Sequence, residues 1–161
     1  MTDTTRTSRY AETAIQKTAL IVGIVFLVVG IAGFIPGLTH PMEEMDAAGA
    51  DSEAMLFGVF QVSILHNIVH LLFGVAGVAV AARAKASRQF LIWGGVIYLL
   101  LFIYGLFAVN APEANFVPVN IADNWLHLVL GIGMLALGLL VDRNRRTNTT
   151  TTGRGTTGRT S

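Results

Sequence analysis

Four ionisable side chains in apolar surroundings are the residues of this chain best suited to chemistry. His66 and His70 are four positions apart in one apolar stretch, and Asp123 and His127 are four positions apart in another. Imidazole and carboxylate groups bind zinc, iron and copper, and two histidines can be the axial ligands of a haem. These four residues are therefore our candidate cofactor-binding site, for a haem or a divalent metal.

Small and polar residues surround these four at helical spacing. One set is Ser63, His66, Asn67, His70 and Gly74, and the other is Asn120, Asp123, Asn124, His127 and Gly131. Positions i, i+3, i+4, i+7 and i+11 share one face of an α-helix. Because polar side chains are costly in a bilayer, we expect both faces to turn inward, with the serine and asparagines as a structural polar stripe. Asn120 and Asp123 also have the spacing of a helix capping box.

Four apolar stretches must carry these faces. A membrane-spanning helix needs about 20 apolar residues. The sequence predicts a membrane domain over residues 18–141, with spans at about 18–35, 56–82, 90–109 and 119–141. The expected fold class is therefore all-α, a four-transmembrane-helix bundle.

The two halves of the chain resemble each other. Residues 66–77 read HNIVHLLFGVAG and residues 123–134 read DNWLHLVLGIGM, with Asn, His, Leu and Gly matched at an offset of 57. The first and third spans match more weakly, through Gly23 with Gly95 and Gly33 with Gly105. We expect an internal repeat, in which the bundle consists of two related helical hairpins.

Basic and acidic residues fall in different loops. All eleven Lys and Arg lie before the first span, between the second and third, or after the fourth, whereas seven of the ten acids lie on the opposite side, six in the other two loops and Asp123 at the outer end of the fourth span. Because Lys and Arg beside membrane spans stay inside, we expect a plasma-membrane protein with both termini in the cytoplasm. Residues 1–17 are then a cytoplasmic segment, and residues 142–161, rich in Thr, Gly and Arg, a disordered cytoplasmic tail.

Several function classes are excluded by composition. Cysteine is absent, which removes disulfide frameworks, Cys-ligated metals and dithiol redox chemistry. His66 and His70 have the H-x-x-x-H spacing, but Asn67 stands in place of the Glu of a zinc protease. With 53% hydrophobic and 13% charged residues, the chain has the composition of a membrane protein, and we expect no nucleic-acid partner.

Three functions remain open for the polar cluster. The one we favour is structural, in which Asn, Asp and His hydrogen bonds hold together an accessory membrane protein. The second is a redox protein that binds haem, metal or quinone through His70 and His127. The third is a proton or small-solute pathway, which four spans would form only as an oligomer. The expected partners are the lipid bilayer and a second copy or another membrane protein. We assign Trp93, Trp125, Tyr98 and Tyr104 to interfacial anchoring or packing.

Several sequence blocks, in order, resemble a known family. They are GxxxxxxGxxGFIPG at 23–37, LFGVFQV at 56–62, HNIVHLLFG at 66–74 and NIADNWLHLVLG at 120–131. The chain is similar over about residues 15–141 to a family of small four-helix integral membrane proteins of unknown function that is common in actinobacteria. The resemblance implies a multi-pass membrane protein and supplies no catalytic residue. A looser likeness, to four-helix bacterial membrane proteins of quinone or terminal-oxidase chemistry, is an analogy of architecture.

Overall fold

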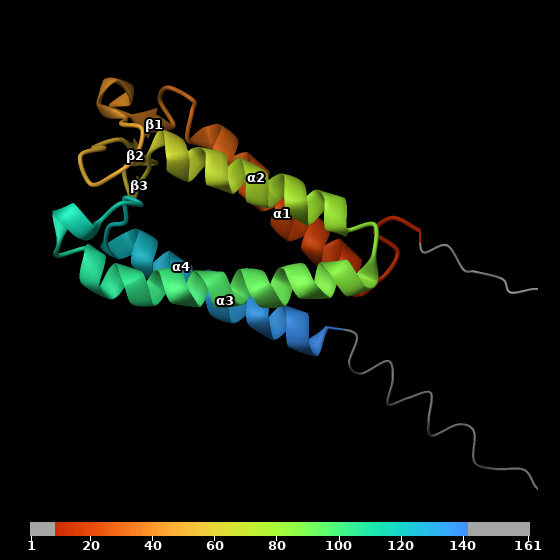
Figure 1. Cartoon of the computed structure of the whole chain (residues 1–161). Coiled ribbons are helices and arrows are strands. Elements are labelled where there is room, and N and C mark those ends of the chain that lie inside the picture. The colour runs from red at the N-terminus through yellow and green to blue at the C-terminus, as the bar shows by residue number, and fades with distance from the viewer. Residues whose placement is uncertain (1–8, 142–161) are drawn as a thin grey trace, which may run out of the picture.

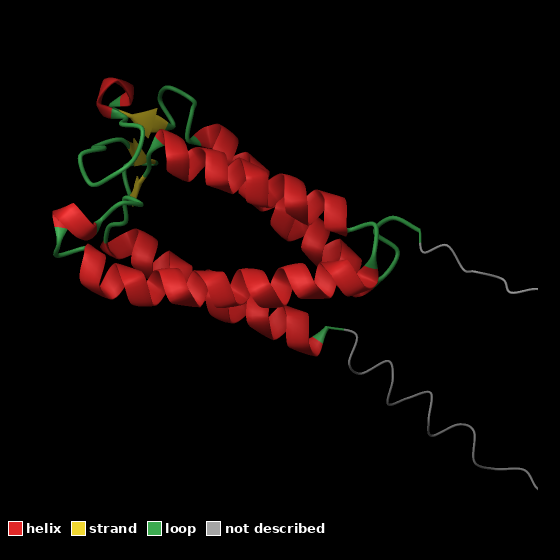
Figure 2. Cartoon of the chain, viewed as in Figure 1, coloured by secondary structure: helices red, strands yellow, loops and turns green. Residues whose placement is uncertain are grey.

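Four helices account for most of residues 9–141, the part of the chain that the computed structural model describes (Figure 2). They are α1 (Ala14–Ala32), α2 (Ile64–Val80), α3 (Ala84–Ala108) and α4 (Ile121–Leu140). The loops hold two single-turn 3-10 helices, η1 (Met42–Glu44) and η2 (Pro112–Ala114). The predicted all-helical class with four helices is confirmed. Residues 1–8 and the predicted disordered tail, 142–161, lie outside the described residues.

The helices are arranged as two packed pairs (Figure 1). α1 packs mainly on α2 (the first pair), α3 packs mainly on α4 (the second pair), and contacts between the pairs are fewer. Glycine allows the close packing, because a Cβ at Gly23 would lie 2.7 Å from the backbone nitrogen of Val78. A Cβ at Gly95 would lie 2.7 Å from the backbone nitrogen of Leu135. Within each pair, the helices therefore touch backbone to backbone.

Side chains fill the space between the pairs. The buried apolar residues that meet there are Ile15, Phe26, Leu91, Tyr98 and Met134. Phe73 and Phe90 pack against this cluster, and their rings are 4.7 Å apart between centroids. The two pairs are thus joined by a large apolar core rather than by backbone contact.

Polar side chains cover the helix ends at one end of the molecule, which we name the turn end. It holds the start of α1, the turn between α2 and α3, and the end of α4 (Figure 1). Gln16 Nε2 donates a hydrogen bond to the carbonyl of Ala81 (2.9 Å), just beyond α2. Arg88 donates to the carbonyls of Gly138 (3.1 Å) and Val141 (2.9 Å), at the end of α4. Both helix C-termini therefore find donors on the neighbouring helix of their own pair.

A small antiparallel sheet covers the opposite end, the loop end. Its strands are β1 (Thr39–His40), β2 (Met55–Leu56) and β3 (Phe60–Gln61), in the order β1-β2-β3. The predicted span at 56–82 is therefore not one helix, since residues 56–62 belong to the β2–β3 hairpin and α2 starts after Ser63. Phe57 and Gly58 at the hairpin turn have φ angles of 54° and 69°, which a helix cannot contain.

The other three helices lie on the predicted apolar stretches with shifted ends. α1 covers 14–32 where 18–35 was expected, and α4 covers 121–140 where 119–141 was expected. α3 starts at Ala84, before the expected 90, so the basic residues Lys85 and Arg88 belong to its first turns.

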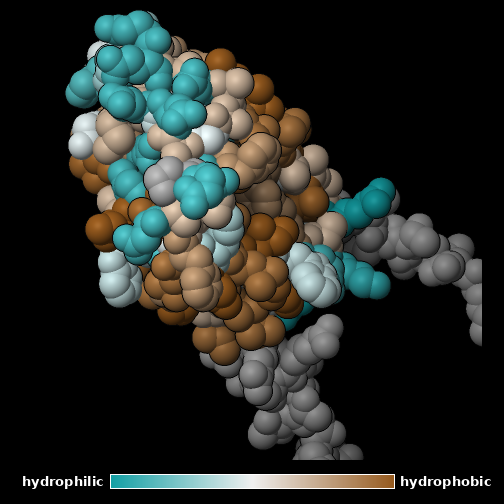
Figure 3. Space-filling view, turned by 60° about the vertical axis from the view of Figure 1, so that its left-hand side comes forward, coloured by the Kyte–Doolittle hydropathy of each residue, from teal (hydrophilic) through white to brown (hydrophobic). Residues whose placement is uncertain are grey.

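The outer surface of the helices is largely apolar. α1, α3 and α4 are long and apolar enough to cross a membrane, whereas α2, with 17 residues, is shorter. Large apolar side chains are exposed along the helices, among them Ile21, Val28, Leu72, Leu100, Phe107 and Val129. Figure 3 shows hydrophilic residues gathered at the loop end and hydrophobic ones over the helical body. Because water-soluble monomers rarely expose apolar patches of this extent, the fold is compatible with a membrane protein.

Candidate ligand site between the helix pairs

The polar face of α2 starts at its N-terminal cap. Ser63 Oγ accepts a hydrogen bond from the backbone N–H of His66 (3.1 Å), which satisfies one free donor of the first turn. His66, Asn67 and His70 follow on one face and are all buried. The first polar set therefore lies inside the protein.

α4 begins with a capping box, as the spacing of Asn120 and Asp123 predicted. Asn120 Oδ1 accepts from the N–H of Asp123, and Asp123 Oδ2 accepts from the N–H of Asn120, both at 3.0 Å. The same carboxylate oxygen accepts from the N–H of Gln61 on β3 (3.0 Å), and Asn120 Nδ2 donates to the carbonyl of Val59 (2.8 Å). Asp123 is thus occupied in joining α4 to the sheet.

Two of the three asparagines of the stripe, Asn67 and Asn124, pack directly on glycines. A Cβ at Gly33 would overlap the side-chain amide of Asn67, and a Cβ at Gly105 would overlap that of Asn124. Asn67 Nδ2 donates to the carbonyl of Gly33 (3.0 Å). These asparagines fit α2 onto the end of α1 and α4 onto α3, which is the packing role expected for them.

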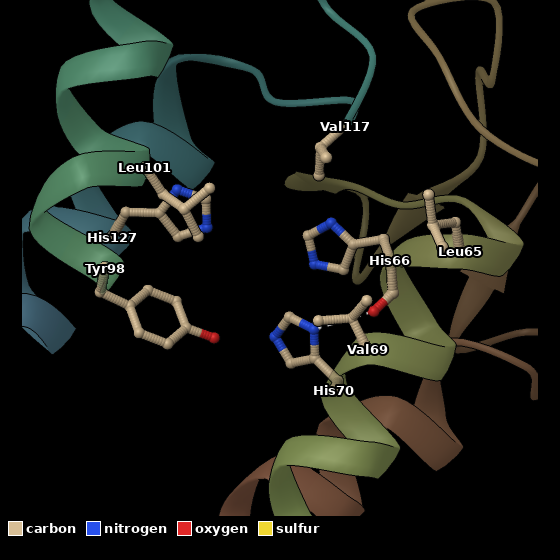
Figure 4. Close-up of a pocket in the computed structure, with 8 residues that line it drawn as sticks. All are labelled: Leu65, His66, Val69, His70, Tyr98, Leu101, Val117 and His127. Atoms are coloured by element: carbon tan, nitrogen blue, oxygen red, sulfur yellow. Dashed lines mark hydrogen bonds between the residues drawn. The ribbon is translucent and has the colours of Figure 1, made fainter. Parts of the chain in front are cut away.

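The histidines do not pack in this way and instead surround a cavity of about 110 Å³, which we name the histidine cavity (Figure 4). Its lining residues are Leu65, His66, Val69, His70, Tyr98, Leu101, Val117 and His127. A second cavity, of about 80 Å³, adjoins His66, His70 and His127 and extends toward Phe57, Phe60 and Asp123. The structure therefore places the three predicted histidines around both cavities and Asp123 beside the second one only, and the histidine cavity has room for a few water molecules or a small ligand group.

Hydrogen bonds inside the protein leave part of each imidazole unused. His70 Nδ1 lies 3.0 Å from the carbonyl oxygen of His66. Because a carbonyl only accepts, His70 Nδ1 carries the proton, and Nε2 of the neutral ring is an acceptor. His66 Nδ1 and His127 Nδ1 are buried and have no hydrogen-bond partner. Figure 4 shows the rings of His66 and His70 on α2 and of His127 on α4 pointing into the same space.

Aromatic rings pack against the histidines of the cavity. His70 contacts Phe26 with ring centroids 5.3 Å apart, and His127 contacts Tyr98 at the same distance. Phe26 and Tyr98 meet each other at 5.6 Å. His66 and His70 are stacked at 4.5 Å with an interplanar angle of 10°. Ring packing therefore contributes to the orientation of the imidazoles, in addition to the hydrogen bond of His70 to the carbonyl of His66.

The geometry gives less support to a metal than the sequence pattern does. Among residues 9–141, no group of three or more His, Cys, Asp or Glu side chains is placed to hold a metal ion. Asp123, the carboxylate of the predicted set, already accepts two backbone N–H groups through one oxygen. His70 and His127 do line one cavity from different helix pairs, as a haem or quinone site would require.

The loop carboxylates Glu44 and Glu53 line neither cavity. Glu44 is exposed, and a hydrogen bond with Glu53 raises its pKa, with a further contribution from the charge of that neighbour. Such a pair of surface carboxylates is repulsive when both are ionised.

The sequence pattern did not place Tyr98 in the cavity wall or Phe26 behind it. Tyr98 was assigned to anchoring or packing, and Phe26 was not singled out. The repeat contained a signal for both, because they lie three positions after the matched glycines Gly23 and Gly95. Phe57 at the hairpin turn and Phe60 on β3 line the second cavity and had no such signal, because the apolar pattern there predicts the start of a span.

A helical fold with exposed apolar helices and a buried polar cluster is compatible with the class of multi-pass membrane proteins. Over residues 16–140 the chain matches the model of a domain of unknown function, DUF4383, and it belongs to that family. No curated protein and no solved structure matches the chain significantly.

Proposed function

We propose that this chain is an accessory protein of the plasma membrane that binds a small ligand in the histidine cavity. The proposal rests on one observation: His66 and His127 line the cavity, are buried, and leave Nδ1 without a hydrogen-bond partner. Most buried polar groups are hydrogen-bonded, and each exception calls for an explanation such as a functional role. Asn67 on the same face of α2 has its partner, so on this helix the unpartnered group belongs to a histidine that lines the cavity.

The membrane arrangement that we propose is a four-span bundle with both termini in the cytoplasm. It is supported by the charges at the two ends of the structure. The basic residues Arg9, Lys17, Arg83, Lys85 and Arg88 belong to the turn end, and the loop end holds Glu43, Glu44, Asp46, Asp51, Glu53 and Glu113. Under the positive-inside rule the turn end is cytoplasmic, and the cavity lies in the outer half of the bilayer.

Single cysteines test this orientation, since the chain has none of its own. Glu43 and Lys85 are exposed at opposite ends. A membrane-impermeant maleimide should label Glu43→Cys in intact cells and Lys85→Cys only after lysis. Labelling of Lys85→Cys in intact cells would reverse the orientation.

We also infer that the two helix pairs are an internal repeat. The support is that contacts recur at fixed offsets, 72 residues for the first helix of each pair and 57 for the second. Gly33 with Asn67 corresponds to Gly105 with Asn124, and Phe26 with His70 corresponds to Tyr98 with His127.

A ligand site fits the cavity better than a conduction pathway. The histidines lie toward the loop end, whereas toward the turn end the space between the pairs is filled by apolar side chains such as Leu91 and Met134. A proton or solute crossing the bilayer would need polar groups through this half as well.

The redox alternative uses the same histidines. His70 and His127 face one cavity from two helix pairs, which favours a haem or a quinone over a metal held by several protein ligands. If haem is the ligand, purified protein should show a Soret band that is lost in His70→Ala. If the band is absent and the protein carries another small molecule, haem is excluded as the ligand, and the proposal of a ligand site is retained.

The proposal is tested by asking what the protein carries out of the membrane. Leu101 lines the cavity, whereas its neighbour Leu100 is 60% exposed on the outer face of α3. We expect wild-type protein and the control Leu100→Trp, purified from native membranes, to release one small molecule in near-stoichiometric amount on solvent extraction. Leu101→Trp, which fills the cavity, should release at least tenfold less.

Two results would overturn the proposal. One is wild-type protein without a stoichiometric small molecule by mass spectrometry of the extract, and the other is equal release from Leu101→Trp. Circular dichroism of each variant should show the same helix content, so that loss of the ligand reports the cavity.

A further inference from the structure

The histidine cavity contains hydrogen-bonding groups that a carbonyl or an ether cannot satisfy alone. His70 Nε2 must accept, because Nδ1 of that ring donates to the carbonyl of His66. A ligand that bonds to His70 must therefore carry a donor. Carbonyl and ether oxygens only accept, so they leave this nitrogen unpaired.

Tyr98 adds a second polar group to the same space. Its ring is 5% exposed, and Figure 4 shows its hydroxyl directed toward His70. A tyrosine hydroxyl both donates and accepts. A ligand group between Tyr98 and His70 can therefore hydrogen-bond to both side chains if it both donates and accepts, as a hydroxyl group does.

The rest of the wall selects for an apolar molecule. Leu65, Val69, Leu101 and Val117 line the cavity, and Phe26 packs behind Tyr98 and His70. No acidic side chain lines the histidine cavity, so a cationic amine would have no counter-charge there. Charged donors are costly at such a site, whereas a neutral hydroxyl is not.

The cavity also reaches the lipid-facing surface. Val69 lines it and is 50% exposed on α2, and contacts between α2 and α3 are fewer than those within either pair. A molecule dissolved in the surrounding apolar phase would meet the cavity at this position.

We infer that the ligand is an apolar molecule with a hydroxyl group, which enters from the bilayer between α2 and α3 and donates a hydrogen bond to His70. This inference rests on the proposed function. It specifies the ligand class by its head group, a lipophilic alcohol or phenol as opposed to a ketone, ether, quinone or amine.

A pair of matched probes tests the head group. 2-Naphthol and 2-methoxynaphthalene share the aromatic body, but only the naphthol donates. Binding of each is measured by titration calorimetry to the full chain in lipid nanodiscs, with empty nanodiscs as the reference for partitioning. We expect wild-type protein to bind naphthol about tenfold more tightly than the ether, the ratio expected for one hydrogen bond.

Variants assign this preference to His70. His70→Phe keeps a ring against Phe26 and removes the acceptor, so it should bind both probes with similar affinity. His40→Phe is the control, because His40 is exposed in the loop end, and it should retain the tenfold preference. Nitrogen-15 NMR of histidine-labelled protein should place the proton of His70 on Nδ1.

The outcomes separate this inference from the proposed function. Equal binding of both probes by wild-type protein, a preference that persists in His70→Phe, or a proton on His70 Nε2 overturns the inference alone. A native ligand without a hydroxyl group does the same. If neither probe binds, the inference is also overturned. If, in addition, the purified protein carries no native ligand, the proposed function is overturned as well.

Discussion

Three positions after the helix cap, α2 has His66 and α4 has Asp123. The surroundings are otherwise alike, since Ser63 caps α2 as Asn120 caps α4, and Asn67 and Asn124 follow. Asp123 accepts hydrogen bonds from the cap residue Asn120 and from Gln61 of the sheet, whereas His66 lines the cavity and its Nδ1 has no partner. The second pair thus uses this position to hold the loop end together, and in the first pair the same position is free to serve the proposed ligand site.

The same contrast occurs on the first helix of each pair. Phe26 and Tyr98 occupy corresponding places against His70 and His127, yet only Tyr98 has a hydroxyl. The glycines and asparagines common to the two pairs hold the helices together, whereas the pairs differ at Phe26 and Tyr98 and at His66 and Asp123. Packing and the proposed binding therefore depend on different positions, and substitutions should separate them.

The largest effect is expected where the backbones touch. Gly23→Val and Gly95→Val place a side chain 2.7 Å from a neighbouring backbone atom, so each should cost about 1–3 kcal/mol in the free energy of unfolding. Thermal unfolding in micelles, followed by circular dichroism, measures the loss. Gly133→Val is the control, because nothing lies within 4 Å of a Cβ at that position. If one of the two pairs tolerates valine, the pairs are not equivalent in packing.

The asparagines should differ from each other. Asn67→Ala leaves the buried carbonyl of Gly33 without its donor and should cost about 1–3 kcal/mol. Asn124→Ala should cost less, since Oδ1 of Asn124 has no partner to lose. Denaturant titration of both variants, with exposed Asn110→Ala as the reference, gives the order. A larger loss for Asn124→Ala would show that the second pair depends on its asparagine more than its contacts indicate.

The caps come next. Ser63→Ala should cost about 1 kcal/mol, as usual for an N-cap, and Asn120→Ala somewhat more, because the bond to the carbonyl of Val59 is lost as well. Hydrogen exchange should rise over residues 55–62 in Asn120→Ala and stay unchanged there in Ser63→Ala. Equal exchange in the two variants would mean that Asn120 does not hold the sheet.

The smallest effect separates charge from hydrogen bonding at the turn end. Gln16→Ala and Arg88→Ala each remove a donor from a helix C-terminus and should cost about 1 kcal/mol. Because Arg88 is charged, its contribution should fall with added salt, whereas that of Gln16 should not. Melting curves at low and high salt test this, with exposed Lys85→Ala as the control for charge. Equal salt responses would mean that Arg88 acts through its hydrogen bonds alone.

The helices and the capping box could be predicted because they depend on neighbours along the chain. Asn120 and Asp123 satisfy each other within one turn, and hydropathy alone marks the apolar stretches. The hairpin at 56–62 could not be predicted in this way. Leu56 of the hairpin pairs with Thr39, and Gln61 donates a hydrogen bond to Asp123. Neither partner can be inferred from the local pattern LFGVFQV.

The sequence predicted that the histidines form a site. It did not predict that the histidines line a cavity whereas the asparagines pack against glycines. Spacing places His66, Asn67 and His70 on one face. Which of them packs depends on Gly33, more than thirty positions earlier in the chain, and which of them faces space depends on Tyr98 of the other pair. Distances along the sequence do not contain that information.

The bond between Gln61 and Asp123 has a consequence for biogenesis. Ribosomes deliver α1, α2 and the sheet before α4 exists, so the strand that covers the cavity waits for a carboxylate synthesised later. Under the membrane arrangement that we propose, the imidazoles of α2 would until then face the interior of the membrane uncovered. Completion of the proposed ligand site would therefore depend on insertion of α4, and a chain truncated before residue 121 would expose the polar face of α2 to lipid.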